Sequence, residues 1–367
     1  MHSLNIAIIG TRGIPNHYGG FEQFAQHLAQ NMVKRGHKVT VYNSHTHPYQ
    51  KHTWNGVNII HKKDPEDKIG TIGQFIYDYN CIVDLKNHNY DIILQLGYTS
   101  GSIWNKWIPK DIILITNMDG LEWKRSKFNK PTQSFLKYAE KLAAKSSNVL
   151  VADSVGIQEH LQKTYSLPST YIPYGATVFD TPDLEILNEF DLQPENYNLL
   201  VARMEPENNI ETIINGHIQS NTKLKLILIG KIDNDFGQYL KTHYANEQIV
   251  FIGGVYNQNK LNNLRYFSHL YFHGHSVGGT NPSLLEAMAS NSLICAHNNI
   301  FNKSILGQNA YYFNDSLQIV NVINSLSQKS FDKEKLNNNR QEIITNYSWE
   351  SIVSQYETLF INSLTNA

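Results

Sequence analysis

Strand-like and helix-like patterns alternate along this chain, and the alternation restricts its fold more than any other feature. In the first half, short runs of β-branched and other apolar residues separate stretches whose apolar residues recur every three or four positions. The clearest helical stretch begins near Phe21 and ends at the "KRG" of residues 34–36. The predicted strands are 4–10, 37–43, 57–60, 90–96, 111–116, 148–153 and 170–175. Such alternation predicts βαβ units and a parallel sheet.

The second half repeats the alternation, with predicted strands at 197–203, 225–230, 248–254, 270–274 and 292–297. Residues 175–195 have two prolines and no strong period, as expected of a connection between domains. We therefore predict an α/β chain of two doubly wound, Rossmann-like domains, residues 1–178 and 179–367, that face each other across a cleft. Ligands are expected at the carboxyl ends of the strands. The sequence leaves open whether the last helical pattern, 349–364, packs back on the first domain.

Charge and cysteine content exclude several classes of protein. The net charge is −1 and the pI is about 7.0, so nothing indicates a nucleic-acid partner. Cys81 and Cys295 lie far apart and neither belongs to a CxxC motif, which argues against a disulfide framework or a cysteine metal site. The first residues lack the pattern of a signal peptide, and no run of about 18 apolar residues occurs. These features predict a cytoplasmic protein.

A glycine-rich loop, "IIGTRGIPNHYGGFEQF" at 8–24, follows the first predicted strand and suggests a phosphate site. It fits a dinucleotide fingerprint poorly, because the GxGxxG helix opens within the glycines, whereas here the helical pattern begins only at Phe21. The second strand ends in "VYNSH" without an acidic residue for a ribose, and a Walker A motif is absent. Nicotinamide and ATP are therefore disfavoured as ligands.

The loop nevertheless places Gly19 and Gly20 directly before a helix. Amide groups at a helix N-terminus attract anions, and glycines let an anion approach the backbone closely. Alternatively, the two glycines only form a tight turn into the helix. Arg12 and His17 either add charge and hydrogen bonds to the site or belong to the surface.

A second candidate anion site lies in "HSVGGTNPSLLEAMAS", residues 275–290. Two glycines precede two good N-caps and a proline suited to the first helical position: Gly278, Gly279, Thr280, Asn281 and Pro282. Glu286 lies one turn into the predicted helix, where a carboxylate can accept hydrogen bonds from the two hydroxyls of a ribose. The alternative is that Glu286 is a solvated helix residue.

Four segments, in order along nearly the whole chain, resemble the retaining glycosyltransferases of family 4. They are "GTRGIPNHYGGFEQF" (10–24), "NMDGLEWKRSKF" (117–128), "VARMEPENNIETII" (201–214) and "HSVGGTNPSLLEAMAS" (275–290). Within that family the chain is most similar to a bacterial subgroup that includes rhamnosyltransferases of surface-polysaccharide synthesis. The resemblance implies the GT-B fold, which consists of two Rossmann-like domains.

The resemblance also implies roles for individual residues. Gly19 and Gly20 match the loop that approaches the donor diphosphate and the transferred sugar, and Arg203 matches the arginine that neutralises the diphosphate. Glu286 matches the glutamate that holds the nucleotide ribose. Asp119 stands near the transferring sugar, where it assists the acceptor hydroxyl or binds the sugar. The remaining donor-binding candidates are Arg12, Gly279, Thr280 and Asn281.

Two positions depart from the family pattern. Gly278 replaces the first glutamate of the E-x7-E motif, and Asn208 replaces a lysine that usually follows Arg203. A different donor sugar, a substitute cation such as Lys231 or Arg12, or lost activity would each account for these changes. Because donors in the subgroup include a 6-deoxy sugar, we predict L-rhamnose transfer from dTDP-rhamnose.

The resemblance implies transfer with retention, in which the leaving diphosphate helps to deprotonate the acceptor. Arg203 and the glycine loops should then matter more than Asp119; in an alternative mechanism Asp119 acts directly as an acid or base. The nucleotide sugar is the donor substrate, and no cofactor is required. The "DND" at 233–235 and the histidines His45 and His47 are short patterns that arise often by chance, so we predict no required metal.

The predicted acceptor is a lipid-linked saccharide, and a basic segment offers a membrane contact. Residues 104–145 include Trp104, Trp107 and Trp123 and an excess of lysine, so they can rest on an anionic bilayer or form a solvated face. The basic residues of 123–145 are Lys124, Arg125, Lys127, Lys130, Lys137, Lys141 and Lys145. Two other functions stay open: a GT-B sugar-nucleotide epimerase, and a catalytically silent GT-B binding protein.

Overall fold

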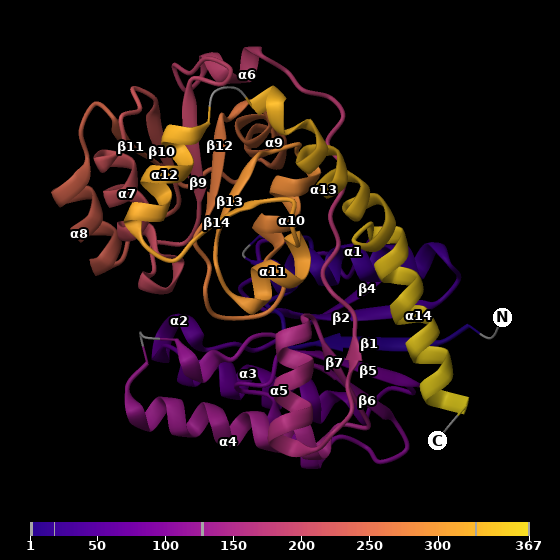
Figure 1. Cartoon of the computed structure of the whole chain (residues 1–367). Coiled ribbons are helices and arrows are strands. Elements are labelled where there is room, and N and C mark those ends of the chain that lie inside the picture. Colours follow the sequence, from indigo (N-terminus) through magenta and orange to yellow (C-terminus); the bar gives the residue numbers. More distant parts are fainter. Residues whose placement is uncertain (1–2, 18, 126–127, 327–328, 366–367) are drawn as a thin grey trace. The chain divides into compact units, whose positions relative to one another are not determined.

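The chain forms two compact α/β units in a computed structural model that describes residues 3–17, 19–125, 128–326 and 329–365. Unit 1 comprises Met1–Tyr174 and Trp349–Ala367, and unit 2 comprises Gly175–Ser348 (Figure 1). The division falls at Tyr174 rather than at the predicted residue 178, and the last helix belongs to unit 1. Within the described part of the chain, no helix is long and apolar enough to cross a membrane.

The sheet of unit 1 has the strand order β3-β4-β2-β1-β5-β6-β7-β8. The short β3 is antiparallel to β4, and the other pairings among these strands are parallel. Because β1 pairs with β2 on one side and β5 on the other, the strand order changes direction across the sheet there, at the position where doubly wound sheets bind ligands. The strands are β1 (Asn5–Ile9), β2 (Lys38–Ser44), β3 (Thr53–Trp54), β4 (Val57–Lys62), β5 (Ile92–Leu96), β6 (Ile113–Asn117), β7 (Val149–Ala152) and β8 (Thr170–Tyr171).

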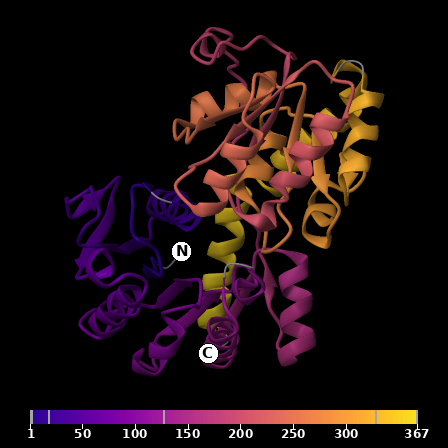
Figure 2. The ribbon, with the colours of Figure 1, turned by 90° about the vertical axis from the view of Figure 1, so that its left-hand side faces the viewer.

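Two helices of unit 1, α4 and α5, begin at a residue whose side chain caps the helix. The Asn129 side chain accepts a hydrogen bond from the Thr132 N–H at the start of α4, and Ser154 caps α5 in the same way. The yellow α14 runs beside the sheet of unit 1 in Figure 1 and Figure 2, and its Trp349 ring stacks on His27 of α1 at 4.2 Å between ring centroids. The helices are α1 (Gly20–Lys34), α2 (Glu66–Ile69), α3 (Ile72–Leu85), α4 (Lys130–Ser146), α5 (Val155–Tyr165) and α14 (Trp349–Thr365), with 3-10 helices η1 (Ser102–Trp107) and η2 (Glu122–Lys124).

Unit 2 has a parallel sheet with the order β11-β10-β9-β12-β13-β14. Its strands are β9 (Tyr197–Val201), β10 (Lys225–Ile229), β11 (Ile249–Gly253), β12 (Leu270–His273), β13 (Ile294–His297) and β14 (Tyr311–Phe313). The sequence missed β14, because three residues carry too little pattern. The helices are α6 (Glu185–Asn188), α7 (Ile210–Gln219), α8 (Asp235–Tyr244), α9 (Gln258–Phe267), α10 (Pro282–Ala289), α11 (Ile300–Leu306), α12 (Ser316–Ser325) and α13 (Lys333–Asn346), with η3 (Pro206–Asn208) and η4 (Lys329–Asp332).

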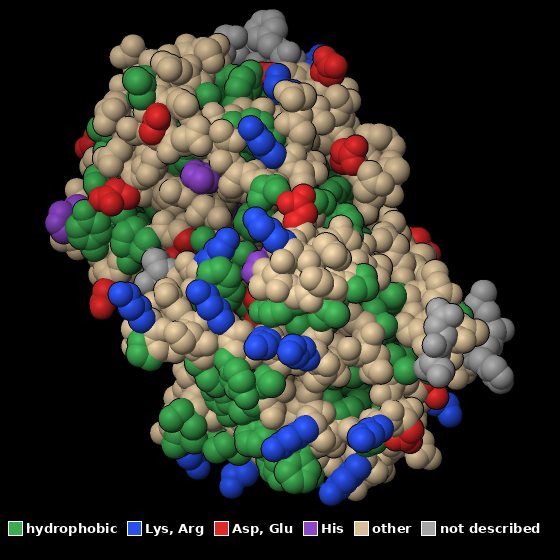
Figure 3. Space-filling model, turned by 60° about the horizontal axis from the view of Figure 1, so that its bottom comes forward, with side chains coloured by type: hydrophobic (Ala, Val, Ile, Leu, Met, Phe, Trp, Pro, Cys, Tyr) green, Lys and Arg blue, Asp and Glu red, His purple; other side chains and the backbone are tan. Residues whose placement is uncertain are grey.

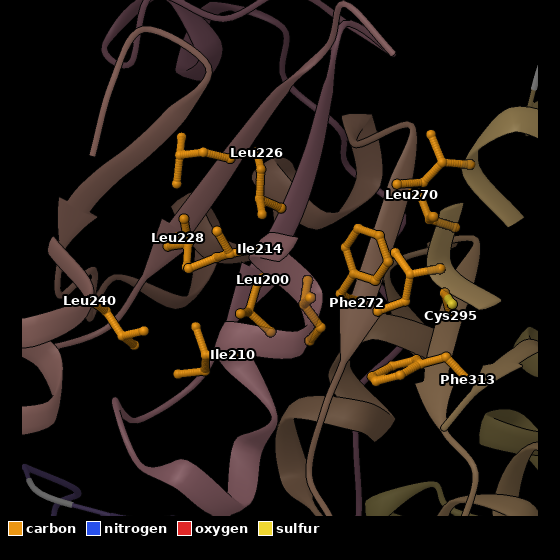
Figure 4. Packing of buried hydrophobic residues seen from close by; sticks show 14 of the residues in the cluster. Leu200, Ile210, Ile214, Leu226, Leu228, Leu240, Leu270, Phe272, Cys295 and Phe313 are labelled. Atoms are coloured by element: carbon orange, nitrogen blue, oxygen red, sulfur yellow. The ribbon is translucent and has the colours of Figure 1, made fainter. Parts of the chain in front are cut away.

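The core of unit 2 fixes the central strands against α7. Leu200, Leu228 and Phe272 of three adjacent strands are buried in one cluster with Ile210 and Ile214 of α7, and their side chains converge in Figure 4. Each buried side chain of this size contributes about 1.5–3 kcal/mol to stability. The packing therefore holds the strand ends, and the loops that follow them, in fixed positions.

Candidate functional site

The carboxyl edge of the unit 2 sheet brings two exposed cations together with a helix N-terminus. Strands β10, β9 and β12 are parallel neighbours, so the residues that follow them meet at one edge. Arg203 follows β9, Lys231 follows β10, and the loop 274–281 follows β12 before α10 begins. Both cations are exposed, and neither forms an ion pair within the described ranges. This edge can receive an anion.

The loop before α10 has a conformation that explains one departure from the family pattern. Gly278 has a φ of +125°, and a Cβ there would lie 3.1 Å from the His275 ring. A glutamate at this position would be strained, since L-residues rarely adopt such a φ. The helix starts at Pro282 as predicted, with the Asn281 side chain accepting a hydrogen bond from the Ser283 N–H at 2.9 Å. Asn281 is thus an N-cap, and Thr280 is buried beside it.

Asn208, the second departure, joins two loops of this edge. Its side chain is buried, its Nδ2 donates to the Arg203 carbonyl at 2.7 Å, and its Oδ1 lies 3.1 Å from His275 Nδ1. A Cβ on Gly274 would collide with the Asn208 carbonyl oxygen, so the two loops touch directly. Asn208 therefore braces the backbone beside Arg203. Two cations, Lys231 and Arg12, were considered as substitutes for the missing lysine. Lys231 lies in this unit and is exposed, whereas Arg12 belongs to unit 1.

Glu286 is held by an arginine that the sequence did not indicate. Arg265 of α9 is 1% exposed and forms an ion pair with Glu286, whose side chain is 16% exposed, at 2.8 Å. Arg265 Nη2 also donates to Ser283 Oγ at 3.1 Å, and that hydroxyl lies 2.7 Å from the Tyr271 hydroxyl. In sequence, Arg265 resembles any surface residue of an amphipathic helix. The ion pair fixes the orientation of the carboxylate predicted to hold a ribose.

His273 is the last residue of β12, and it lies close enough to Arg265 to be affected by its charge. The imidazole is buried, and burial, aided by the nearby Arg265 charge, lowers its pKa to about 3. Its Nε2 has no hydrogen-bond partner among the residues that the structure describes. A neutral imidazole at a strand end can orient loop 274–281, but it cannot supply charge to an anion.

The arginine of the unit 1 glycine loop is paired with a carboxylate. The Arg12 guanidinium binds Glu66 of α2, with Nη2 at 2.8 Å from Oε2 and Nε at 3.1 Å from the same oxygen. The Arg12 backbone N–H donates to Glu22 Oε1 at 2.9 Å. A carboxylate balances the charge of this cation, and a phosphate contact of Arg12 stays a prediction.

The helix N-terminus of unit 1 is likewise occupied by a carboxylate. α1 starts at Gly20 with Gly19 as its N-cap, and Glu22 in the first turn is buried. A Cβ on Gly19 would lie 3.0 Å from Glu22 Oε2, so this carboxylate sits against the glycine pair. It satisfies the positive end of the helix, where an anionic ligand would otherwise bind.

A cavity of about 220 Å³ opens beside this loop. Four carboxylates and one arginine line it, so its charge is negative, and it suits the hydroxyl groups of a sugar better than a diphosphate. The histidines His17 and His47, with rings 6.4 Å apart, lie on its wall. The charged residues are Arg12, Glu22, Asp64, Glu66 and Asp67.

Asp119 lies at the same carboxyl edge of unit 1, after β6. It is half-buried and has a φ of +46°, and its N–H donates to Asn117 Oδ1 at 3.0 Å. Asn117 Nδ2 in turn donates to the Tyr356 hydroxyl of α14 at 3.2 Å. The left-handed φ and these two bonds hold the backbone at Asp119 in place. Two strand spacings separate β6 from β1, which places Asp119 about 10 Å from the glycine loop.

The segment that follows Asp119 is anchored by a buried carboxylate, Glu140 of α4. His160 Nε2 lies 2.8 Å from Glu140 Oε1, the Tyr165 hydroxyl donates to that oxygen at 2.7 Å, and Trp123 Nε1 donates to Oε2 at 3.0 Å. Burial alone would raise the pKa of Glu140, but these donors hold it below its usual range. Glu140 therefore remains charged and fixes the loop.

The short metal-like patterns serve local structure. Asn234, between the two aspartates of "DND", caps α8 by accepting a hydrogen bond from Gly237 N–H at 2.8 Å. His45 Nδ1 accepts from Asp64 N–H, and His47 Nδ1 accepts from Tyr49 N–H. Over the ranges that the structure describes, no group of three or more metal-ligating side chains occurs.

Two Rossmann-like units of this topology have the GT-B fold, and solved structures confirm the fold class. The chain is similar to sucrose-phosphate synthase from Thermosynechococcus elongatus (TM-score 0.82, 16% identity, 99% of this chain and 100% of that chain). It is also similar to a glycosyltransferase from Rickettsia africae (TM-score 0.76, 16% identity, 100% of both chains). A third similar structure is Anabaena HepE in complex with UDP and glucose (TM-score 0.75, 15% identity, 98% and 99%).

Sequence comparison adds two partial matches. Residues 3–177 match the family described as a domain of unknown function, DUF1972. An uncharacterized 42.6 kDa protein in the cps region of Klebsiella pneumoniae is 28% identical over 123 residues, a match that spans 28% of this chain and 33% of that protein. The chain thus spans a third of the length of the curated relative it matches. Membership of glycosyltransferase family 4 and of the rhamnosyltransferase subgroup stays a prediction.

Proposed function

We propose that this protein is a hexosyltransferase that uses a nucleotide-diphosphate sugar as its donor. The observation that carries the proposal is the carboxyl edge of unit 2, where exposed Arg203 and Lys231 lie at the strand ends beside α10. A diphosphate needs two or more positive groups and backbone amides, which this edge supplies. In the proposal, Glu286 accepts the ribose hydroxyls from its fixed position on Arg265.

The nucleotide is a pyrimidine diphosphate in this proposal. HepE, a structural neighbour, binds UDP and UDP-glucose, which supports a uridine or thymidine nucleotide. We retain dTDP-L-rhamnose as the donor to test first, because the bulk and charge of a glutamate are missing at Gly278. No cofactor beyond the donor and no metal is part of the proposal.

Transfer is proposed to retain the anomeric configuration. Arg203 and the amides of α10 stabilise the departing diphosphate, whose oxygen takes the acceptor proton as the new glycosidic bond forms. Asp119, whose backbone N–H is bonded to Asn117, orients the sugar or the acceptor hydroxyl in this proposal. The acidic cavity beside the unit 1 glycine loop accepts hydrogen bonds from the acceptor saccharide.

The acceptor is proposed to be lipid-linked, with unit 1 resting on an anionic bilayer. Figure 3, which turns the α4 side of Figure 1 forward, shows lysine and arginine side chains among hydrophobic ones on this face. The apolar part of this surface consists of exposed side chains of α2, α3, η1 and α4: Ile69, Ile72, Ile76, Trp107 and Tyr138. Exposed lysines lie on η1, η2, α4 and the adjoining turn: Lys106, Lys110, Lys124, Lys130, Lys137, Lys141 and Lys145. Such a mixture suits an anionic membrane.

The tryptophans contribute less to this surface than the sequence suggested. Trp104 Nε1 donates to the Phe75 carbonyl and Trp123 Nε1 donates to Glu140, so both rings are turned inward, and Trp107, at 53%, is the exposed ring of the three. Arg125 is paired with Glu122 at 2.6 Å, and Lys127 lies outside the described residues.

A cps-region relative supports a role in surface-polysaccharide synthesis.

A donor panel tests the function. The melting temperature of the purified protein is measured with dTDP-, UDP- and GDP-sugars, because a ligand that binds the native state raises it. Product that forms only with an added lipid-linked acceptor supports transfer. Epimerised donor without acceptor would indicate a GT-B epimerase instead, and stabilisation by nucleotide with neither reaction would indicate a silent binding protein. A preference for GDP would overturn the pyrimidine assignment.

A further inference from the structure

The acidic cavity beside the unit 1 glycine loop contains two buried carboxylates that have no cationic partner. Glu22 and Asp64 line this cavity, and each residue is only 4% exposed. Neither forms an ion pair with any residue that the structure describes. A buried carboxylate without a cation retains much of the cost of leaving water, and the N-terminus of α1 supplies only about half a positive charge to Glu22. A cationic ligand can supply the rest.

One oxygen of each carboxylate is fixed by the backbone, and the other is left for the cavity. Glu22 Oε1 accepts a hydrogen bond from the Arg12 N–H at 2.9 Å, and Asp64 Oδ1 accepts one from the Glu66 N–H at 3.0 Å. The second oxygens, Glu22 Oε2 and Asp64 Oδ2, accept no hydrogen bond among the described residues, and both keep accessible surface. The wall therefore presents two acceptors whose positions the backbone holds.

The basic side chains of the lining do not balance these two charges. The Arg12 guanidinium binds Glu66, with Nη2 at 2.8 Å from Oε2. His47 Nδ1 accepts from the Tyr49 N–H and its Nε2 lies 3.2 Å from the Pro15 carbonyl, so the ring is neutral, and burial lowers its pKa. Carboxylates outnumber arginines in the lining by four to one. The cavity therefore attracts a positive charge.

The size and the hydroxyl groups of the cavity narrow the class of cation. Its volume of about 220 Å³ is below the range of about 300–1,000 Å³ of sites for drug-sized ligands, so it suits a single sugar unit. No group of three metal-ligating side chains occurs in the described ranges, which disfavours a metal ion. A primary ammonium has three donors, enough for both free carboxylate oxygens. The Ser44 and Thr46 hydroxyls, 2.9 Å apart on the same wall, can bind hydroxyls of a sugar ring.

We propose that this cavity recognises a sugar unit with a free, protonated amino group, whose ammonium donates hydrogen bonds to Glu22 Oε2 and Asp64 Oδ2. The inference rests on the proposed function, in which this cavity takes the acceptor saccharide, and it specifies that acceptor as an unacetylated amino sugar. Acetylation of the amine removes its charge, so the N-acetyl form of the same sugar should bind poorly.

Ligand-observed saturation-transfer NMR on the full chain, without nucleotide sugar, tests this proposal. The probes are D-glucosamine, D-galactosamine and 4-amino-4,6-dideoxy-D-glucose, each compared with its N-acetyl derivative, and glucose and magnesium chloride as probes of other chemistry. The pH is kept near about 6.5, because an amino group beside electron-withdrawing substituents, like an α-amino group, has a pKa of about 7.7–8.0. We expect at least one amino sugar to bind at least tenfold more tightly than its N-acetyl derivative.

Variants that remove one charge locate the binding. Glu22→Gln and Asp64→Asn keep an acceptor for the backbone N–H but lose the negative charge, so each should weaken amino-sugar binding at least tenfold. Glu159→Gln, at an exposed position of α5 outside the lining, should leave the binding unchanged. If both lining variants fail to fold, Pro48→Arg, at an exposed lining position, should place a competing guanidinium at the cavity and weaken binding to a similar extent.

Three results would overturn the proposal: no binding of any amino sugar, equal binding of an amino sugar and its N-acetyl derivative, or binding that survives in a folded double variant, Glu22→Gln with Asp64→Asn. Transfer of sugar to a neutral acceptor, together with no amino-sugar binding, would overturn this proposal and leave the proposed transferase function intact. Amino-sugar binding by a protein that transfers no sugar would overturn the transferase function and leave the cavity assignment intact.

Discussion

Replacing Glu286 with alanine should destabilise unit 2 rather than only impair donor binding. The variant leaves the Arg265 guanidinium, which is 1% exposed, without its carboxylate partner at 2.8 Å. A buried charge that loses its partner retains the full cost of leaving water, and breaking a buried ion pair typically costs about 3–5 kcal/mol. Because the Glu286 side chain is 16% exposed, water can reach the site, and we expect a loss near the lower end, about 3 kcal/mol.

Thermal and urea unfolding measure this loss. For a unit of this size, about 3 kcal/mol corresponds to a melting temperature lower by about 6–12 °C. Circular dichroism is the appropriate signal, because all five tryptophans lie in unit 1. The matched control is Glu334→Ala, which removes an exposed glutamate of α13 in the same unit and should change stability by less than about 0.5 kcal/mol.

A double variant tests the cause. Arg265→Met combined with Glu286→Leu removes both charges and should recover most of the stability that Glu286→Ala loses, because apolar residues can replace a buried ion pair at little cost. If Glu286→Ala unfolds within about 0.5 kcal/mol of the wild type, the ion pair is not a buried one in solution and the reasoning fails. If Glu286→Ala does destabilise the unit, donor binding should be measured with Glu286→Gln instead, because this variant keeps an acceptor for Arg265.

Three further predictions concern separate parts of the chain. Arg203→Ala should weaken nucleotide-sugar binding at least tenfold in calorimetry with little change in melting temperature, because this arginine is exposed; unchanged affinity would remove it from the donor site. Burial lowers the pKa of His217 from 6.5 to about 4, so the unfolded chain binds a proton that the folded unit does not. Stability should therefore fall, by up to about 3 kcal/mol, as pH drops from 6.5 to 4, and His217→Leu should flatten this part of a stability-against-pH curve. Lys130→Gln with Lys141→Gln should weaken binding to anionic vesicles about 30-fold at low salt, at about 1 kcal/mol per lysine, whereas Lys241→Gln in unit 2 should not; a lack of vesicle binding by the wild type would refute the membrane surface.

The architecture was accessible from the sequence because periodicity and helix caps are local signals. Buried parallel strands appear as continuous apolar runs, and Asn281 with Pro282 marks the start of α10. The strand β14 was not predicted, because Tyr311–Phe313 is too short to show a period. Which unit contains the last helix depends on contacts such as the Trp349–His27 stacking, between residues distant in sequence.

The positions of the candidate site residues at strand ends were predictable, but the partners of their charges were not. Loops after parallel strands converge at the carboxyl edge, so the general location of Asp119, Arg203 and Glu286 followed from the strand order. The partner of each charged group did not. Arg12 is neutralised by Glu66, 54 positions later, and Glu286 by Arg265 on the preceding helix, and neither pairing leaves a pattern in the sequence.

These pairings change the interpretation of two glycine loops that look alike in sequence. In unit 1, the amides and the guanidinium that could bind a phosphate already face Glu22 and Glu66, so an incoming diphosphate would have to displace two carboxylates. In unit 2, the carboxylate of Glu286 is balanced by Arg265, which leaves the exposed charges of Arg203 and Lys231 at the strand ends. Electrostatic attraction to an anion is therefore strong at one loop and weak at the other. It follows that the phosphates of the proposed donor should depend mainly on unit 2, while the unit 1 loop is suited to sugar hydroxyls.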